Sequence, residues 1–408
     1  MASNFCSSYI VSGCYIHNDI AFSILSRLPI KSLKRFQCVS KPWSRLTEDS
    51  RFMTMYRKNF LLSQSYDGDT SLLVNIFSDR EKFHFLSGER FENRVSFIYP
   101  VKTYCAVAIN GFASVNGILC LQHGSRGKSF SLWNPTTGEV KVIPHSMTLL
   151  PPIVNKYKAA DHFRHRTMHH GFGYDSVADD YKVICRETFE PLFFNDELGK
   201  KKSFLVQDES LQPFWQIYSL KSNSWKKLYV NMPHSSTFLV DNLHGNFRVY
   251  MNGMCHWLSM PHYHWSVPFS AESCMVSFDL NNETFFVTPI PSYVRLTWTH
   301  LTVLNNSIAL IFFPMNTNIF HISILGEVGV KESWIKLFTV EKPCALATFP
   351  TGVGMNGEIV FADDDNKLLL FDLNTNKIVE LGLKRRDKLT LGQIKVYKKS
   401  LLPIKRIN

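Results

Sequence analysis

Two periodicities of apolar residues divide the chain, and the change falls near residue 60. Between residues 16 and 60 apolar positions recur at helical spacing, which places them on one face of a helix. The clearest of these positions are Ile16, Ile20, Ile24, Leu25 and Leu28. Beyond residue 60 the apolar runs are short and end at Asn, Asp, Gly or Pro, which is typical of strands and tight turns. The pattern predicts a helical module at residues 16–60 and a mainly β body at 61–402.

The first two helices of this module have recognisable boundaries. Asn18 or Asp19 can begin the first helix by accepting a hydrogen bond from a free backbone N–H group. Pro29 cannot continue that helix, so the chain is expected to turn there. A second short helix follows, with Leu33 and Phe36 on one side.

A third helix is expected to begin near Ser40, with Pro42 in its first turn. Its buried stripe would be Val39, Trp43 and Leu46. The prediction is three short helices that share one apolar face. A helical cap or a helix-turn-helix would share this pattern.

The run LSRLPIKSLKRFQCVSKPWSRL at residues 25–46 resembles the plant form of the F-box. A Leu-Pro pair, a Val-Ser-Lys triplet and a Trp recur in that family at this spacing. The chain departs from the family at Ile16-His17, where Leu-Pro is usual, and at Ser23, where an acid is frequent. The resemblance implies binding to a Skp-type adaptor and, through it, to a cullin–RING ubiquitin ligase. The adaptor-binding residues that it implies are Ile16, His17, Ile20, Ile24, Leu25, Leu28, Pro29, Leu33, Val39, Ser40 and Trp43.

Repeated pairs of strands organise the β body. One form surrounds Asn-Gly, at 116–117, 252–253 and 356–357, with a weaker copy at Asn305-Asn306; Asn-Gly suits a two-residue hairpin. The other has an aromatic strand, a polar turn and a returning strand, at 132–140, 217–225, 278–285, 320–334 and 371–378. Five units are clear, and strands in 71–110 and near 391–401 would complete a sixth. Units that cannot bury both faces alone stack radially, so a β-propeller of about six blades is predicted, with a two-layer sandwich as the alternative.

This body also resembles the kelch-like F-box-associated domain of plant F-box proteins. The most recognisable segments are LWNPTTGEVKVIP at 132–144 and GFGYDSVADDYKVICR at 171–186. The two resemblances together imply a non-catalytic substrate-recognition subunit of an SCF-type (Skp–cullin–F-box) E3 ubiquitin ligase. The alternative is a propeller-fold enzyme, such as a kelch-type oxidase or a hydrolase.

Composition limits the cellular compartments in which the protein is expected. The chain of 408 residues is 45% hydrophobic and has no apolar run that could span a membrane. Residues 1–15 contain no Lys or Arg, so they do not form a secretory signal and are expected to be disordered. The nine cysteines are scattered and never spaced as C-x-x-C, which favours reduced thiols and a location in the cytoplasm, the nucleus or both.

The net charge of +11 raises the question of nucleic-acid binding. Residues 17–60 hold nine Lys and Arg against three Asp and Glu, and residues 381–408 hold nine against one. The rest of the chain is therefore slightly acidic, whereas a nucleic-acid binder concentrates basic charge on its binding body. We expect no nucleic-acid partner, a solvated basic tail ending at 403–408, and no membrane partner.

Candidate catalytic and metal sites are weak. Four histidines, His162, His165, His169 and His170, fall within nine residues, but the interleaved Arg164 and Arg166 would repel a cation. A polar loop between blades and no metal are expected there. The acidic run at 363–365 is expected to form a hairpin turn. Phosphate-loop, nucleophile-elbow and zinc-protease motifs are absent from the sequence, so no catalytic residue and no cofactor are predicted.

Target binding is predicted on long connections between strands, because loops are free to vary while strands are committed to the core. Three segments are too long for tight hairpins, at 144–170, 191–213 and 259–273. They carry the aromatic candidates for contact with a target protein, namely Phe193, Phe194, Tyr263, His264 and Trp265.

Overall fold

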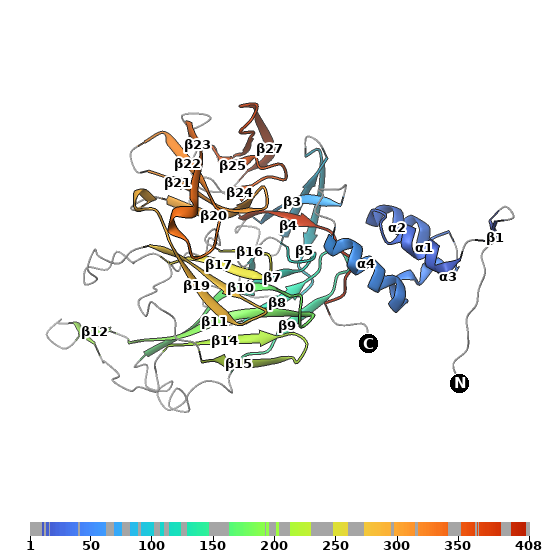
Figure 1. The fold of residues 1–408 in the computed structure, drawn as a ribbon, viewed down its shortest axis with the longest axis horizontal. Helices are drawn as coiled ribbons and strands as arrows, with labels where there is room; N and C mark the ends of the chain where they lie inside the picture. Colours follow the sequence, from blue (N-terminus) through green and yellow to red (C-terminus); the bar gives the residue numbers. More distant parts are fainter. Residues whose placement is uncertain are drawn as a thin grey trace.

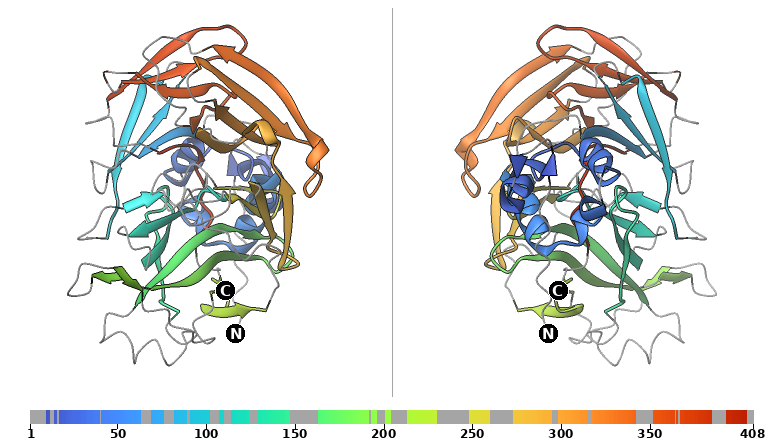
Figure 2. Two further views of the ribbon diagram at one scale, coloured as in Figure 1. Left: turned by 90° about the vertical axis from the view of Figure 1, so that its left-hand side faces the viewer. Right: turned by 90° about the vertical axis from the view of Figure 1, so that its right-hand side faces the viewer.

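The protein forms a ring of six four-stranded antiparallel sheets with a group of helices against one of its faces, as seen in a computed structural model (Figures 1 and 2). The structure describes residues 10–11, 14–15, 17–39, 41–62, 69–75, 82–88, 91–101, 107–109, 114–123, 129–146, 163–191, 193–195, 201–203, 213–229, 248–259, 273–294, 298–314, 317–341, 352–363, 365, 367–384 and 393–404. The predicted six-bladed β-propeller is confirmed. Figure 2 looks down the ring and places the helices over its centre.

The helical module contains the three predicted helices, and a further helix follows them. The helices are α1 (Asn18–Leu25), α2 (Ile30–Gln37), α3 (Lys41–Ser44), the 3-10 turn η1 (Leu46–Glu48) and α4 (Ser50–Leu62). His17 is the N-cap of α1 and its ring accepts from the Asp19 N–H, so neither Asn18 nor Asp19 has that role. The third helix is a single turn, and α4 is a separate helix that begins where the Asp49 carboxylate accepts from two backbone N–H groups.

Three blades come from the middle of the chain. They are β6 (Val107–Ile109), β7 (Leu119–His123), β8 (Ser129–Trp133) and β9 (Val140–Ile143); β10 (Phe163–Asp175), β11 (Asp180–Pro191), β14 (Phe214–Ser219) and β15 (Ser224–Leu228); and β16 (Arg248–Met251), β17 (Met254–Ser259), β18 (Cys274–Asp279) and β19 (Thr284–Pro289). Their strands are hydrogen-bonded in chain order. A separate pair, β12 (Phe193–Asn195) with β13 (Lys201–Ser203), lies between β11 and β14 in the chain.

The remaining blades include the one that closes the ring. They are β20 (Trp298–Leu304), β21 (Ser307–Phe313), β22 (Ile319–Leu325) and β23 (Trp334–Glu341); β24 (Gly352–Val353), β25 (Ile359–Ala362), β26 (Lys367–Phe371) and β27 (Ile378–Lys384); and β28 (Gln393–Lys398) with β3 (Thr70–Asn75), β4 (Lys82–Ser87) and β5 (Asn93–Ile98). Short 3-10 turns, η4 (Ser292–Val294) and η5 (Lys331–Ser333), connect some of them. The closing blade combines β28, from the end of the described chain, with three strands from its beginning.

The first strand of each sheet lies next to the axis. Contacts between neighbouring blades join β10 to β16, β16 to β20, β20 to β24 and β24 to β28. The space between blades is filled by apolar side chains, and among the largest fully buried ones are Trp133, Trp257 and Tyr397. The last of these stands on β28, which therefore belongs to the core.

Hairpin turns follow the sequence pattern with one exception. Asn116 and Gly117 have φ values of 54° and 79°, and Asn252 and Gly253 have 50° and 79°, as a two-residue hairpin requires. Asn305 and Asn306 adopt the same conformation without glycine. At 356–357 only the glycine has a positive φ, so this Asn-Gly pair forms a different turn.

The second repeated form joins the two outer strands of a blade. The residue after the aromatic caps the turn, because its side-chain oxygen accepts from a backbone N–H two residues ahead. Asn134 accepts from Thr136 at 2.9 Å, Asp279 from Asn281 at 2.8 Å and Asp372 from Asn374 at 2.8 Å. The predicted turn at 363–365 is also present, since β25 and β26 are antiparallel neighbours and the Asp363 carboxylate accepts from the Lys367 N–H.

Three segments differ from expectation. Residues 163–170, expected to be a loop, belong to β10, which pairs with β11 from Phe163 to Asp175. The basic segment near the end is no solvated tail over 393–404, because Lys395 is 7% exposed and Ile404 is 3% exposed. Within residues 1–15, Ile10–Val11 (β1) pairs with Cys14–Tyr15 (β2). None of the described helices has the length and apolar character needed to cross a membrane.

Candidate adaptor-binding surface and target-binding face

The helical module has a filled apolar core. Its buried members are Phe22, Leu25, Ile30, Leu33, Leu46, Phe52, Met53 and Tyr56, joined by Leu401 and Leu402 from beyond β28. Leu25 and Leu33, predicted to bind an adaptor, are 4% and 1% exposed. They therefore hold the helices together and do not face a partner in this conformation.

Three other predicted residues are exposed aliphatic side chains. Ile20 and Ile24 are 57% and 55% exposed, and Val39 is 70% exposed. The prediction that Val39 is buried is wrong, because the chain leaves α2 in a turn there and the stripe continues through Leu46 instead. Ile20 and Ile24 are four residues apart on α1, so their side chains are neighbours on one face. This pair forms an exposed apolar surface on α1.

The remaining residues that were predicted to bind an adaptor differ in how far they are exposed. His17 and Pro29 are exposed, while Leu28 and Trp43 are half-buried. Trp43 packs edge-on against Phe36, with ring centroids 5.5 Å apart. Ile16 and Ser40 lie outside the described residues.

Exposed basic side chains are a further property of the helical module that the predicted residue set missed. Lys31, Lys34 and Arg35 are exposed on α2, and Lys41 and Arg45 are exposed after it. The excess of Lys and Arg in residues 17–60 was the signal for it. Such a surface favours an acidic partner through charge complementarity.

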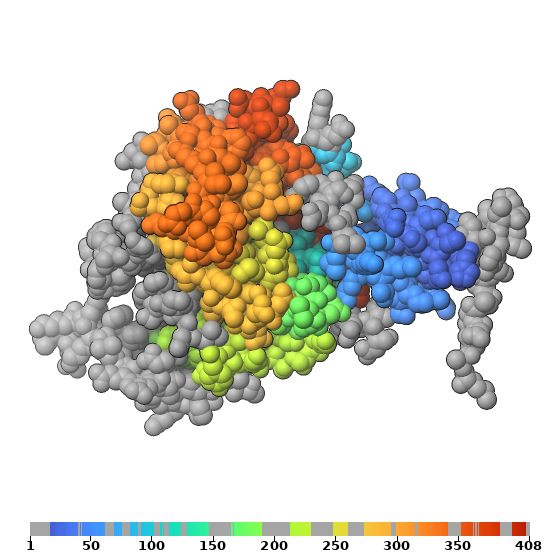
Figure 3. All heavy atoms as spheres, viewed as in Figure 1, coloured from blue at the N-terminus to red at the C-terminus, as the bar shows by residue number. Residues whose placement is uncertain are grey.

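The predicted target-binding residues lie in the part of the chain that is least described. Phe193 and Phe194 are on β12, paired with Ser203 and Lys202 of β13. This hairpin lies on the side of the propeller away from the helices (Figure 1), and the space-filling view shows the helical module standing out from the opposite side of the ring (Figure 3). Tyr263, His264 and Trp265 lie outside the described residues.

The histidine-rich run is divided among separate partners along β10. The His165 Nε2 atom is 2.5 Å from the Glu187 carboxylate, and His169 Nε2 is 3.6 Å from the Cys120 Sγ atom. His170 packs edge-on between Trp215 and Trp257, with centroid distances of 4.5 and 5.1 Å. His162 lies outside the described residues. Within the described chain, no group of three or more His, Cys, Asp or Glu is placed to hold a metal ion.

The Cys120–His169 contact has the composition of a nucleophile and its base, but its electrostatics oppose that chemistry. Burial raises the pKa of the Cys120 thiol and lowers the pKa of His169 well below its usual range, with Arg248 lowering the latter further. Both groups are therefore neutral, whereas a catalytic cysteine is activated as a thiolate. The pair fills space between blades.

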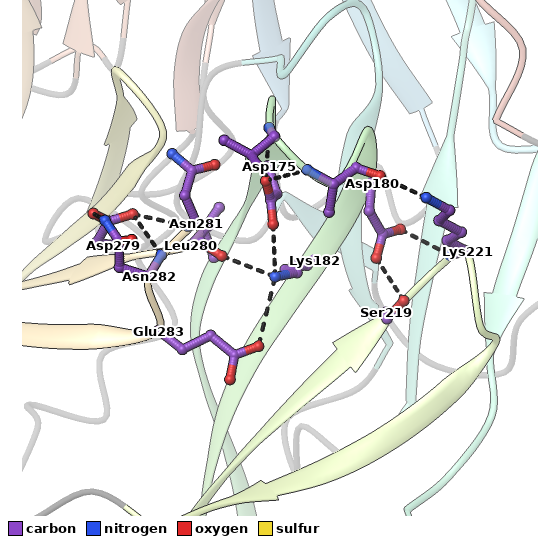
Figure 4. A network of polar contacts seen from close by, with 12 residues as sticks. Asp175, Asp180, Lys182, Ser219, Lys221, Asp279, Leu280, Asn281, Asn282 and Glu283 are labelled. Atoms are coloured by element: carbon purple, nitrogen blue, oxygen red, sulfur yellow. Dashed lines mark hydrogen bonds and ion pairs between the residues drawn. The ribbon is translucent and has the colours of Figure 1, made fainter.

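The GYDSVADDYK segment builds a polar network at the turn between β10 and β11 (Figure 4). The buried Lys182 ammonium lies 2.7 Å from the Asp175 carboxylate, donates to the Leu280 carbonyl at 2.8 Å and approaches Glu283 at 3.6 Å. The same Asp175 carboxylate accepts from the N–H groups of Val177 and Ala178. Because Leu280 and Glu283 belong to the next blade, the network joins two blades and its charges are compensated.

Comparison with known proteins agrees with this architecture. Residues 71–396 match the family described as "F-box associated beta propeller domain", and residues 16–54 match "F-box domain". F-box protein CPR1 of Arabidopsis thaliana is 25% identical over 381 residues, covering 91% of this chain and 83% of that protein. An F-box/kelch-repeat protein of Arabidopsis thaliana is 26% identical over 290 residues, covering 69% and 59% of the two chains.

A solved structure titled as a nidogen/laminin complex has a TM-score of 0.43 at 12% identity, covering 81% of this chain and 99% of that one. That likeness is too distant to inform on function. The match over residues 71–396 spans most of the ring, and it is preceded by the F-box match over the helices. The chain therefore belongs to the family of proteins with an F-box associated β-propeller domain, carried behind an N-terminal F-box.

Proposed function

We propose that this protein is the substrate-recognition subunit of an SCF-type E3 ubiquitin ligase, which binds a Skp-type adaptor through its helices and a target protein through its propeller. The observation that carries the proposal is the exposed Ile20–Ile24 pair on a module whose apolar core is already filled. A module that exposes both an aliphatic pair and basic side chains fits a partner that is partly apolar and partly acidic.

The protein's contribution would be proximity and not chemistry. Holding a target beside the conjugating enzyme raises the effective concentration of the target's lysines. The neutral Cys120–His169 pair and the compensated Lys182 network support a non-catalytic role for the propeller. The described cysteines, Cys38, Cys120, Cys185, Cys255 and Cys274, carry free thiols, which supports a location in the cytoplasm or the nucleus.

Replacing Ile20 and Ile24 together by Asp should abolish adaptor binding and leave the fold intact. Burying an aliphatic side chain contributes about 1.5–3 kcal/mol, so losing two of them should weaken binding by about a hundredfold or more. The measurement is a titration of purified protein with recombinant Skp-type adaptor. The matched control is Ile98→Asp with Val142→Asp, two aliphatic residues 69% and 52% exposed on outer strands. Wild-type affinity in the Ile20/Ile24 variant would refute the assignment.

Target capture should be lost when two of the long connections between strands are shortened. Replacing 192–212 or 260–272 by a Gly-Ser linker removes the predicted aromatic anchors, and we expect the proteins that co-purify under proteasome inhibition to disappear. Adaptor binding and thermal stability should not change, because the six sheets are untouched. The control is Ile335→Ser with Leu337→Ser, exposed aliphatic residues of β23. Unchanged co-purification in both shortened forms and in one lacking 147–162 would place recognition elsewhere.

A further inference from the structure

Helix α4 is attached to the propeller by a charged side chain. The Arg57 Nη1 atom lies 2.9 Å from both carboxylate oxygens of Asp179, in the β10–β11 turn. The guanidinium stands over the Tyr174 ring at 5.7 Å, and the Tyr174 hydroxyl donates to Asp179 at 2.6 Å. Arg57 and Asp179 are 31% and 29% exposed, so the pair is partly shielded from solvent and stronger than an open surface pair.

A second attachment runs through the segment after β28. Leu401 and Leu402 are 5% and 3% exposed within the core of the helices. The Leu401 N–H donates to the Tyr56 hydroxyl at 3.3 Å. On the propeller side, the Asn134 amide donates to the carbonyls of Ser400 and Leu402 at 3.1 and 2.9 Å. One short segment is thus bonded to both parts of the molecule.

A third attachment involves the beginning of α2. The Ile30 N–H donates to the Asp69 carboxylate at 2.6 Å, and this contact is buried. Asp69 directly precedes β3, and its carbonyl accepts from the Lys399 N–H at 3.0 Å. The attachments therefore reach α2, α4 and the core between them. Three separate points remove the rotations that a single linker would allow.

We infer that Arg57, Asp179 and the Leu401–Leu402 pair are positioning residues that fix the direction in which the helices hold the propeller. The far face of the ring is then kept at one distance and orientation from whatever the helices bind. The biological meaning of this inference rests on the proposed function. There, the effective concentration of the target near the conjugating enzyme depends on how well the connection between helices and propeller matches the distance between the two binding sites. Whether the helices keep one orientation relative to the propeller can be tested on the protein without any partner.

The experiment measures a distance distribution between one dye on α2 and one on an outer turn. Dyes attached through non-canonical amino acids at the exposed positions Lys34 and Lys377 would report it by single-molecule energy transfer. The wild type should give one narrow distribution. Arg57→Glu places two carboxylates together and should broaden the distribution about twofold, since motion is the default where an interface between domains is weak.

A second substitution and a matched control make the result specific. Adding Asp179→Asn to Arg57→Glu replaces the repulsion by a hydrogen bond from the amide to the carboxylate and should narrow the distribution again; Asn tolerates the φ of 52° at this position. Lys58→Glu reverses an exposed charge on the same helix and should change nothing. Equal widths in wild type and Arg57→Glu, equal broadening in Lys58→Glu, or no recovery in the double variant would overturn the inference. A narrow wild-type distribution in a protein that fails to bind adaptor would refute the proposed function alone.

Discussion

A chain that stops before residue 393 should fail to fold into a stable propeller. Strand β28 is the innermost strand of the closing blade, and it pairs with β3 over six residues. Ile394 packs with the blade of β24–β27 and Tyr397 with the blade of β6–β9, each 1% exposed. Loss of a large buried side chain costs roughly 2–5 kcal/mol, and Leu401 and Leu402 would be lost as well. The combined loss from these four side chains matches or exceeds the free energy of roughly 5–15 kcal/mol that stabilises a typical domain.

The matched control is a chain that ends after Ile404, which keeps every described contact of this segment. We expect this form to unfold cooperatively at the wild-type temperature, while the form that lacks 393–408 shows no cooperative transition by circular dichroism and is digested rapidly by protease. A cooperative transition of normal size in the shorter form would mean that the ring closes without β28.

Replacing Asp175 by Ala should be among the most destabilising single changes in the propeller. The change leaves the Lys182 ammonium, only 10% exposed in its side chain, without its nearest carboxylate. Breaking a buried ion pair by removing one partner costs about 3–5 kcal/mol. Asp372→Ala is the control, because Asp372 caps an equivalent turn and has no buried lysine; we expect a loss of about 1 kcal/mol there.

The same residue predicts a pH dependence. Burial alone would raise the pKa of Asp175, but hydrogen bonds from the Ala178 N–H, from Lys182 and from the Val177 N–H outweigh it and lower the pKa. A carboxyl whose pKa is lower in the folded state stabilises that state above its ordinary value, near 4, and this contribution is lost as the pH falls through the folded value. The difference in unfolding free energy between wild type and Asp175→Asn should therefore shrink in acid. A difference that is small at neutral pH, or constant down to pH 2–3, would contradict this role for the ion pair.

Local patterns predicted those parts of the fold that depend on local chemistry. Pro29 marks the boundary between α1 and α2, and Asn252-Gly253 forms the hairpin that its φ preferences demand. The turn-capping Asp279 and Asp372 were visible as the polar residue after an aromatic strand. These features arise from backbone conformation and from hydrogen bonds between near neighbours, so a short window of sequence contains them.

The parts that could not be predicted depend on residues far apart in the chain. The strand over 163–170 looks polar, but Glu187 on the paired strand β11 and Cys120 on β7 of another blade accommodate His165 and His169. Leu401 and Leu402 stand in a basic segment, and nothing near them indicates that they join the core that contains Phe22 and Leu33. For the candidate site, helical spacing identified Ile20 and Ile24 but could not separate them from Leu25, which faces the core.

The place of Leu401 and Leu402 in the core of the helices has a consequence for synthesis. A ribosome makes residues 17–62 first, yet the apolar core of these helices is complete only after residues 401–402 have emerged. Domains usually fold in the order in which they are translated. Here the core of helices α1 to α4 is completed only by Leu401 and Leu402, which are translated after the propeller. A nascent chain interrupted inside the propeller would thus carry an F-box whose apolar core is incomplete.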